Sequence, residues 1–348
     1  MNLAELTTLR LGGPAVRLVD CESEADLIDV IRDCDGRGEP VLVLGGGSNL
    51  VVADEGFAGT VVRVRTRGIT VDDAGCGEDD LAACGGLVVS VAAGENWDDL
   101  VARAVGEGWI GVEALAGIPG AVGATPMQNV GAYGQEVAET IWTVRTYDRA
   151  VRAIRTFANA ECGFGYRTSQ FKGSDRYAIL EVSYQLRQGS LGTPVRYAEL
   201  ARALGVEVGG RAKLAEVRDA VLELRRGKGM VLDDSDHDTW SAGSFFTNPV
   251  LDPGDAAALP DAAPRWPLAD GRVKTSAAWL IDHAGFGRGY AGPGGRVSLS
   301  TKHTLALTNR GGASTADLIA LAREVRAGVL AVFGVELLNE PVLVGCAL

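Results

Sequence analysis

The chain has 348 residues, of which 47% are hydrophobic and 22% charged, and these values exclude disordered and fibrous proteins. Its 33 Lys and Arg against 45 Asp and Glu give a net charge of −12, so neither nucleic acid nor an anionic membrane is an expected partner. The sequence shows no membrane span of about 18 apolar residues, no secretion signal and no CxxC pair, a pattern that favours a cytoplasmic protein.

The N-terminal half alternates between strand and helix patterns. Residues Ser23–Gly38 predict a helix, because Ser23 can cap it and apolar residues recur at helical spacing. Residues Asn96–Glu107 predict a second helix opened by an asparagine cap. The acidic, glycine-rich stretch Asp72–Gly86 predicts a solvated hairpin tip. Apolar runs predict strands at Pro40–Leu44, Thr60–Val64 and Leu87–Ala93.

The C-terminal half continues this mixture of elements. Residues Lys213–Arg226 and Ser314–Phe333 predict amphipathic helices, the second with Ser314 and Asp317 as a capping box. Residues Leu251–Gly271, rich in Pro, Gly and Ala, predict a long surface connection. Strands are expected at Ile141–Tyr147, Val151–Phe157, Tyr177–Leu186 and Leu337–Val344. The order of elements favours an α/β or α+β class, with a boundary between residues 187 and 230.

Two glycine-rich segments suit ligand binding. Gly45-Gly46-Gly47 follows a predicted strand and can point several backbone N–H groups at phosphate oxygens, although its spacing is neither a Walker A loop nor GxGxxG. The stretch Gly117–Gly134 is small and nearly uncharged, which lets backbone approach a flat, uncharged ring system. The alternatives are a tight turn for the first segment and a buried structural loop for the second.

Three single residues stand in surroundings that suit chemistry. Arg167, among aromatics and glycines, suits a clamp for a carboxylate or phosphate. Ser244, between a glycine and two phenylalanines, suits a local proton donor. Glu340 is a carboxylate among apolar residues of the last predicted strand, where an unpaired charge is costly. The alternatives are an arginine in a surface turn, a hydrogen-bonded turn serine and an exposed edge-strand glutamate.

Seven segments occur in a characteristic order: LGGGSNLVV, GENW, GIPGAVGATPMQNVGAYG, FGYRTSQFK, GSFFTNP, AAWLIDHAG and EPVLVG. They span almost the whole chain, and together they resemble the UDP-N-acetylenolpyruvoylglucosamine reductase (MurB) family of peptidoglycan synthesis. The stretch Gly192–Lys228 resembles the insertion of the longer family variant, in which a tyrosine loop folds over the nucleotide.

The resemblance implies an α+β fold with an FAD-binding domain of the vanillyl-alcohol-oxidase (PCMH) type at residues 1–190. A variant-specific insertion at 191–228 and a smaller C-terminal substrate-binding domain at 229–348 would follow, the last strand returning to the active site. It also implies NADPH-dependent reduction of UDP-N-acetylglucosamine enolpyruvate to UDP-N-acetylmuramate, with FAD and NADPH as cofactors. We expect a monomer in the cytoplasm, with small-molecule substrates and no metal, nucleic acid or membrane.

The resemblance also implies roles for single residues. Arg167 and Glu340 would polarise the enolpyruvyl carboxylate, and Ser244 would give a proton to C2 after hydride passes from flavin N5 to C3. Expected substrate contacts come from Tyr166 (before Arg167 in an active-site strand), Tyr197, Lys228, Asn248 and His303, where Lys228 meets a phosphate and the Lys302-His303 pair suits a diphosphate. The expected flavin contacts are Leu44, Gly45, Gly46, Gly47, Ser48, Asn49, Ile118, Pro119, Gly120, Gly123, Ala124, Thr125 and Gln128.

Two other functions compete with this interpretation. A flavin-dependent sugar or alcohol oxidase of the same fold would react with oxygen, and many such oxidases tether flavin through a histidine near the first glycine loop. No histidine precedes His237, which argues against that tether. A non-enzymatic flavin or nucleotide-sugar binding protein is the other alternative, and the presence of Arg167, Ser244 and Glu340 argues against it.

Overall fold

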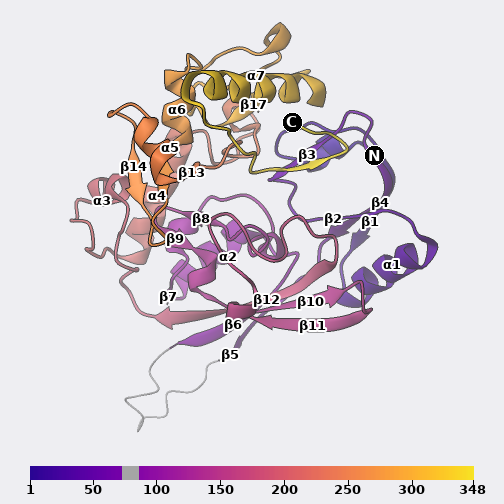
Figure 1. The fold of residues 1–348 in the computed structure, drawn as a ribbon. Coiled ribbons are helices and arrows are strands. Elements are labelled where there is room, and N and C mark those ends of the chain that lie inside the picture. Colours follow the sequence, from indigo (N-terminus) through magenta and orange to yellow (C-terminus); the bar gives the residue numbers. More distant parts are fainter. Residues whose placement is uncertain (73–85) are drawn as a thin grey trace. The chain divides into compact units, whose positions relative to one another are not determined.

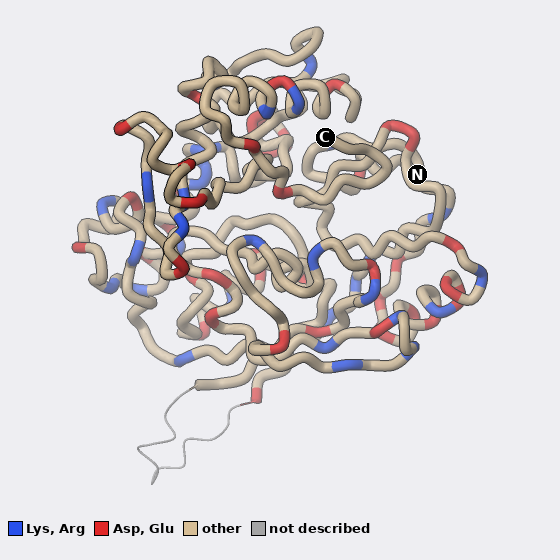
Figure 2. The backbone as a smooth tube through the Cα atoms, in the orientation of Figure 1, with Lys and Arg blue, Asp and Glu red and all other residues tan. Residues whose placement is uncertain are grey.

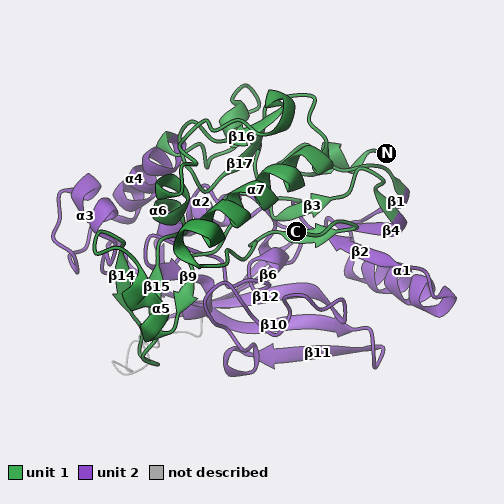
Figure 3. Ribbon diagram, turned by 45° about the horizontal axis from the view of Figure 1, so that its top comes forward, with its two compact units in different colours: residues 1–15, 47–57, 227–348 green, residues 16–46, 58–226 purple. Residues whose placement is uncertain are grey.

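The structure is a computed structural model that describes residues 1–72 and 86–348. The chain forms two compact units, each built from segments that are distant in sequence (Figure 3). Unit 1 comprises residues 1–15, 47–57 and 227–348, and unit 2 comprises residues 16–46 and 58–226. Both units combine helices with mainly antiparallel sheets, so the α+β class is confirmed. The expected domain boundaries at 190 and 228 stay a prediction.

Unit 2 is built on a six-stranded sheet with the strand order β11-β10-β12-β6-β5, and β7 pairs with β12 (Figure 1). All its pairings are antiparallel, and alternate residues of β6 are buried, as expected of a strand with one face on the core. The strands are β5 (Ile69–Asp72), β6 (Leu87–Ala92), β7 (Trp109–Ile110), β10 (Ile141–Asp148), β11 (Ala153–Ala158) and β12 (Tyr177–Gln188). The predicted hairpin tip between β5 and β6 lies mostly outside the described residues.

A second, three-stranded sheet of unit 2 has the order β1-β4-β2 and leads into the first glycine loop. Its strands are β1 (Ala15–Cys21), β2 (Val41–Leu44) and β4 (Phe57–Val64), with β2 and β4 parallel. Helix α1 (Glu24–Arg37) begins after the Ser23 cap and ends where Gly38 adopts a left-handed conformation, as predicted. Helix α2 (Trp97–Gly106) is capped by Asn96, whose side chain accepts a hydrogen bond from Asp99.

The stretch expected as an insertion holds two helices, α3 (Ala198–Leu204) and α4 (Leu214–Gly227). Helix α4 matches the predicted amphipathic segment within one residue at each end, and its buried side chains recur at helical spacing. The loops of unit 2 contain short elements that matter for the site. These are η2 (Glu113–Leu115), η3 (Val122–Ala124), β8 (Gly131–Ala132) and β9 (Gln135–Glu136).

Unit 1 packs three helices and several short strand pairs around its own core. The strands are β3 (Leu50–Val52), β13 (Val250–Leu251), β14 (Arg265–Pro267), β15 (Val273–Thr275), β16 (Val297–Leu299), β17 (Leu307–Asn309) and β18 (Val342–Val344). The helices are α5 (Pro253–Ala258), α6 (Ala277–His283) and α7 (Thr315–Phe333). The predicted capping box of Ser314 and Asp317 opens α7.

Two expectations for unit 1 are wrong. Residues Leu251–Gly271 are not a plain surface connection, because they contain α5 and β14, with Pro253 starting the helix behind an aspartate. The final strand is shorter than expected and covers only Val342–Val344, which pair with β3. The residues before it do not pair with β3, and Asn339 pairs with Phe246 instead.

The acidic excess is not gathered in one segment of the described chain. Acidic and basic residues are interspersed along the backbone in both units (Figure 2). None of the described helices is both long enough and apolar enough to span a membrane.

Candidate active site

The two predicted glycine segments meet inside unit 2. A β-carbon on Gly46 would lie 2.6 Å from the Cα atom of Gly120, and one on Gly45 would lie 3.4 Å from the Cβ atom of Ala121. Real β-carbons essentially never approach a backbone atom as closely as the first distance. Glycine is therefore required at Gly46, where backbone packs directly on backbone, whereas a β-carbon at Gly45 would make an ordinary contact.

The GENW segment holds the second glycine loop in place. The backbone N–H of Trp97 donates to the Gly120 carbonyl (3.0 Å), and Val122 N–H donates to the backbone carbonyl of Glu95 (2.9 Å). Gly123 N–H donates to Ala93 (2.9 Å), and a β-carbon at Gly123 would lie 2.6 Å from the Ala93 β-carbon. Two of the seven recognised segments thus form one rigid backbone surface.

This surface is open, apolar and nearly free of side chains. Gly46 and Ala124 are exposed, and Gly45 and Gly120 are partly exposed. The expected contacts Ile118, Pro119, Gly123 and Gln128 are also partly exposed, and residues 117–128 carry no charge. Exposed backbone without side chains allows a planar ring or a diphosphate to approach closely. The residues present therefore fit FAD.

Two of the expected flavin contacts have buried side chains. Leu44 is 3% exposed at the end of β2, and Thr125 is 3% exposed. The Thr125 hydroxyl donates to the Val122 carbonyl (2.8 Å) and lies 3.0 Å from the Tyr184 hydroxyl. These side chains shape the loops from behind, and their contact with flavin stays a prediction.

The remaining part of the first glycine segment belongs to unit 1. Gly47 is buried with a positive φ of 62°, and a β-carbon there would collide with the Leu6 carbonyl. Ser48 and Asn49 are partly exposed. The Asn49 carbonyl accepts from Val342 N–H (3.0 Å), and its amide nitrogen lies 3.5 Å from the Glu340 carbonyl. The C-terminal segment thus runs beside the end of the glycine motif.

Arg167 is held in a turn of unit 2, not in a strand as expected. Its φ is +53°, and Gly165 pairs with Thr168 on either side of it. The guanidinium donates to the carbonyls of Gly131 (2.6 Å) and Asn129 (3.4 Å) and lies 3.9 Å from Glu136. Its side chain is 19% exposed.

Two further hydrogen bonds join the same two segments. The Asn129 amide donates to the Gly165 carbonyl (3.1 Å), and the Ser169 hydroxyl donates to Met127 (2.7 Å). Tyr166 sits at the tip of the turn, 36% exposed, with its ring 5.4 Å from the Arg167 guanidinium carbon. The third and fourth recognised segments are thereby fixed to each other by side chains.

Ser244 and Glu340 lie on two segments of unit 1 that run side by side. Glu340 N–H donates to the Phe245 carbonyl (2.8 Å), Thr247 N–H donates to Leu338 (3.0 Å), and Phe246 pairs with Asn339. Ser244 and Glu340 are both partly exposed, whereas Phe245 and Phe246 are fully buried. Phe245 and Phe246 anchor the segment of Ser244 in the core. Because Glu340 is hydrogen-bonded to Phe245, Ser244 is next in sequence to the residue that Glu340 pairs with.

The other expected substrate residues of unit 1 lie on three separate segments. Phe245 N–H donates to Leu305 (2.7 Å), in the turn that carries His303. The Asn248 side-chain oxygen accepts from the first N–H of α6 (3.0 Å), and Lys228 directly follows α4. Lys302, considered for a diphosphate, forms an ion pair with Asp236 (2.6 Å), which partly neutralises its charge.

Tyr197 lies at the start of α3 in unit 2, and its ring meets the ring of Tyr133 edge-on at 5.6 Å. Tyr197 is 47% exposed. Burial raises the pKa of Tyr133 to about 12, so that hydroxyl stays protonated at neutral pH. The tyrosine loop therefore rests on the GAYG segment of the second glycine loop.

Sequence reasoning missed the polar groups that hold Gly117. The Asp98 carboxylate accepts from Gly117 N–H (2.6 Å), and the Arg225 guanidinium donates to its carbonyl (3.2 Å). Arg218 lies 3.5 Å from Asp98, and burial lowers the pKa of Arg225 to about 10. Amphipathicity predicts helix α4 but does not say which loop its arginines reach.

Comparison with protein families matches both parts of the chain. Residues 15–152 match a family described as FAD binding domain, and residues 234–344 match one described as UDP-N-acetylenolpyruvoylglucosamine reductase, C-terminal domain. The first match includes both glycine segments, and the second includes Ser244 and Glu340.

Curated relatives and a solved structure agree with these matches. A UDP-N-acetylenolpyruvoylglucosamine reductase from Thermobifida fusca is 57% identical over 99% of this chain and 97% of the relative. The reductase of the same name from Cutibacterium acnes is 56% identical over 99% and 90%. The crystal structure of the Thermus caldophilus enzyme (MurB) is 26% identical, covers 99% of this chain and 97% of its own, and superposes with a TM-score of 0.65.

Proposed function

Because this chain belongs to the UDP-N-acetylenolpyruvoylglucosamine reductase family, an FAD-containing oxidoreductase family, we propose that it reduces UDP-N-acetylglucosamine enolpyruvate with NADPH. The observation that carries the proposal is the pairing of the Ser244 and Glu340 segments. That pairing supports a proton donor and a carboxyl group that act on one substrate.

The glycine surface of unit 2 would hold the cofactor. Backbone at Gly45, Gly46 and Gly120 offers the close approach that a flavin or its diphosphate needs, and Ile118 and Pro119 supply apolar contact. FAD held there would supply the hydride transfer from NADPH to C3 of the vinyl group. The remaining chemistry, which is to polarise the substrate and to protonate it, falls to the protein's own side chains.

Three side chains would carry that chemistry. Arg167 and Glu340 polarise the enolpyruvyl carboxylate, so that negative charge developing at C2 is stabilised by groups already in position. Glu340 does this as an acid or as the partner in a shared proton, because a bare carboxylate would repel the anion. Ser244 donates the proton to C2, and since a hydroxyl is a weak acid, water must resupply it.

Five residues would position the substrate. Lys228 contributes a compact positive charge for a phosphate oxygen. Tyr166 and Tyr197 offer exposed aromatic faces. Asn248 holds the first turn of α6 through its side-chain oxygen and would contribute a polar side chain to the substrate site. His303 completes the set from the turn beside Phe245.

The two half-reactions test the assignment of Ser244. We expect Ser244→Ala to keep NADPH reduction of the bound flavin within about twofold and to slow reduction of the enolpyruvyl substrate by at least about 1000-fold. Both rates are measured by stopped-flow absorbance of the flavin. Equal slowing of both half-reactions would show that the serine is structural.

Oxygen consumption separates the reductase from the oxidase. The proposed enzyme couples NADPH oxidation to the enolpyruvyl substrate, with little oxygen uptake in its presence. A protein whose turnover instead follows oxygen would be a flavin oxidase of this fold.

The finer organisation belongs to the same proposal. We place the enzyme in the cytoplasm as a monomer, with the enolpyruvyl nucleotide sugar and NADPH as its small-molecule partners. Residues 1–190 would bind FAD and 229–348 would bind substrate, joined by the 191–228 insertion. Light scattering of the purified holoenzyme measures the mass, and a dimer would contradict this assignment.

A further inference from the structure

Glu113 is a buried acid to which the proposed reaction assigns no role. It lies in η2 of unit 2 and is 1% exposed. One carboxylate oxygen accepts from Gly111 N–H (2.7 Å), and the other accepts from Thr193 N–H (2.7 Å) and the Thr193 hydroxyl (3.1 Å). All these partners are uncharged donors. Burying a carboxylate costs desolvation free energy, which these hydrogen bonds offset, so the position calls for an explanation.

Gln135 closes the network from the other side. Its side-chain oxygen accepts from Ala114 N–H (2.7 Å), and its amide nitrogen donates to the Thr193 hydroxyl (2.6 Å). The Thr193 hydroxyl therefore accepts from Gln135 and donates to Glu113, which fixes its orientation. Gln135 is 5% exposed, so both side chains that grip Thr193 are shielded from water.

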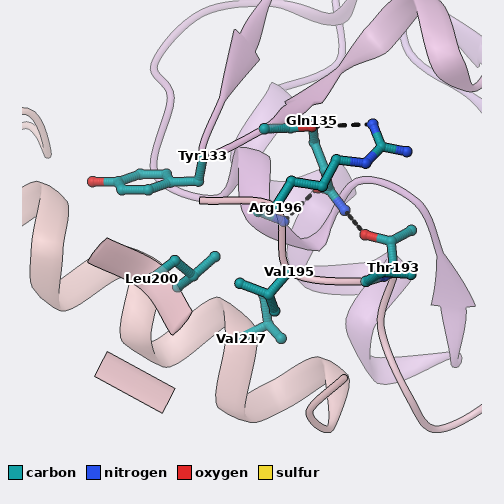
Figure 4. Close-up of a pocket in the computed structure, with 10 residues that line it drawn as sticks. Tyr133, Gln135, Thr193, Val195, Arg196, Leu200 and Val217 are labelled. Carbon is teal, nitrogen blue, oxygen red and sulfur yellow. Dashed lines mark hydrogen bonds between the residues drawn. The ribbon is translucent and has the colours of Figure 1, made fainter. Parts of the chain in front are cut away.

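The segment that begins at Thr193 ends at Tyr197. Gln135 and Thr193 line a small pocket with Val195, Leu200 and Val217, and Tyr133 extends away from their hydrogen bond (Figure 4). Tyr133 is two residues from Gln135 and meets the Tyr197 ring at 5.6 Å. The network therefore fixes both chain segments that carry the aromatic pair.

Close packing limits how far this segment can move. A β-carbon at Gly192 would lie 2.8 Å from the Glu113 carboxylate, and one at Gly134 would lie 3.0 Å from the Arg196 β-carbon. Arg196 also forms an ion pair with Glu139 (2.6 Å). Residues 192–196 thus lie directly on the loop that continues from the second glycine segment.

We propose that Glu113, acting through Thr193 and Gln135, is a positioning residue that holds Tyr197 where it covers the nucleotide part of the substrate. This inference rests on the proposed function, because it uses the UDP-sugar as the ligand beneath Tyr197. Three donors converge on Glu113, and only a carboxylate offers two acceptor oxygens that can receive all of them. The hydrogen bonds that Glu113 accepts come from Gly111 and Thr193, so its role in the proposal is indirect.

Glu113→Gln is the direct test. A glutamine must aim its NH₂ group at the N–H of Gly111 or of Thr193, so one hydrogen bond becomes a clash of donors. We expect KM for the enolpyruvyl substrate to rise about tenfold, while the rate of flavin reduction by NADPH stays within about twofold. Glu107→Gln, an exposed acid at the end of α2, is the matched control and should leave both values unchanged.

Thr193 gives a conservative pair of variants. Thr193→Val keeps the shape and removes the hydroxyl that joins Glu113 to Gln135, so it should raise KM as Glu113→Gln does. Thr193→Ser restores the hydroxyl and should restore KM to within about twofold of the wild type. Equal KM values for the valine and serine variants would overturn the role of this hydroxyl.

A double-mutant cycle tests whether the effect passes through the tyrosine. In a Tyr197→Ala background, Glu113→Gln should raise KM by less than about twofold, because the residue being positioned is already gone. A full tenfold rise there would show that Glu113 acts independently of Tyr197 and would overturn the proposal.

Hydrogen exchange tests, without substrate, whether Glu113 holds the segment from Thr193 to Tyr197. In Glu113→Gln holoenzyme, the amides of Thr193 and of residues 195–197 should exchange at least about tenfold faster, with the β10 and β12 amides unchanged. Unchanged exchange of these amides would contradict the claim that Glu113 holds this segment. An inactive wild-type protein would instead overturn the proposed function, so the two failures are distinguishable.

Discussion

The Arg167 region and the Ser244–Glu340 region are built by different means. Arg167 sits in a turn of unit 2 that is tied to its neighbouring loop by side chains, among them its own guanidinium, Asn129 and Ser169. Ser244 and Glu340 lie on segments of unit 1 that are tied together by backbone hydrogen bonds at Phe245 and Thr247.

This difference predicts how each region responds to substitution. Where side chains hold the backbone, replacing a functional residue also moves the loop that carries it, so geometry and chemistry are lost together. Where backbone holds backbone, a side chain can be replaced and only its chemistry is lost. Ser244→Ala is therefore a clean probe of a proton donor, and no substitution of Arg167 is equally clean.

Among the substitutions that follow, the largest effect should come from Gly46→Ala, because the glycine surface of unit 2, unlike the Arg167 turn, rests on a contact between two backbone segments. The added β-carbon would lie 2.6 Å from Gly120 Cα, so the two glycine loops must separate. We expect FAD affinity to fall more than about 100-fold, measured by flavin fluorescence on titration. Near-normal affinity would show that these loops do not form the flavin surface.

Gly36→Ala is the control for this change. Gly36 lies within α1 of the same unit, and a β-carbon there meets nothing within 4 Å. Alanine should leave flavin binding unchanged and stabilise the helix by about 0.5–1 kcal/mol.

Arg167→Lys should have an intermediate effect and tests whether side chains hold the turn that carries Arg167. Lysine keeps the charge but cannot donate to Gly131 and Asn129 while also presenting a planar fork to a carboxylate. We expect substrate reduction to slow about 10–100-fold, and amide exchange in the Asn129–Gly131 loop to rise. Arg32→Lys, on the exposed face of α1, is the control. Unchanged amide exchange in the Asn129–Gly131 loop would contradict the structural role of Arg167.

The smallest effect on activity should come from Asp317→Asn, in the frame of unit 1. Hydrogen bonds from Arg296 hold the pKa of Asp317 well below its usual range, and the carboxylate also receives Ser314 N–H at the start of α7. We expect turnover within about twofold of the wild type, and a free energy of unfolding lower by about 1 kcal/mol at neutral pH.

The pH dependence of that stability difference has a definite sign. Since the folded pKa of Asp317 is lowered, its stabilisation is complete above the ordinary carboxyl pKa of about 3.9 and fades as pH falls below it. Denaturation with urea at several pH values should show the wild type and variant converging in acid. A gap that widens in acid would contradict this origin.

Much of the fold was accessible from local sequence signals. Serine and asparagine caps predict the starts of α1, α2 and α7, and apolar runs predict β6, β10, β11 and β12 of the main sheet but not β5 and β7. The prediction is wrong between residues 251 and 271, because Pro and Gly are typical of loops but Pro253 starts α5. The predicted strands at Glu340 and Arg167 are also wrong. The pairing of Asn339 with distant Phe246 and the positive φ of Arg167 have no local sequence signal.

The family resemblance, the glycine segments and the three residues proposed for the chemistry can be identified without a structure, because short motifs of neighbouring residues carry them. Three requirements emerge only in the folded chain: Gly46 must lack a side chain to fit against Gly120, Gly47 must lack one to fit against Leu6, and buried Glu113 accepts hydrogen bonds from Thr193. The physical reason is that close packing and hydrogen-bond satisfaction join residues far apart in the chain, and such requirements become visible only when both partners are in place.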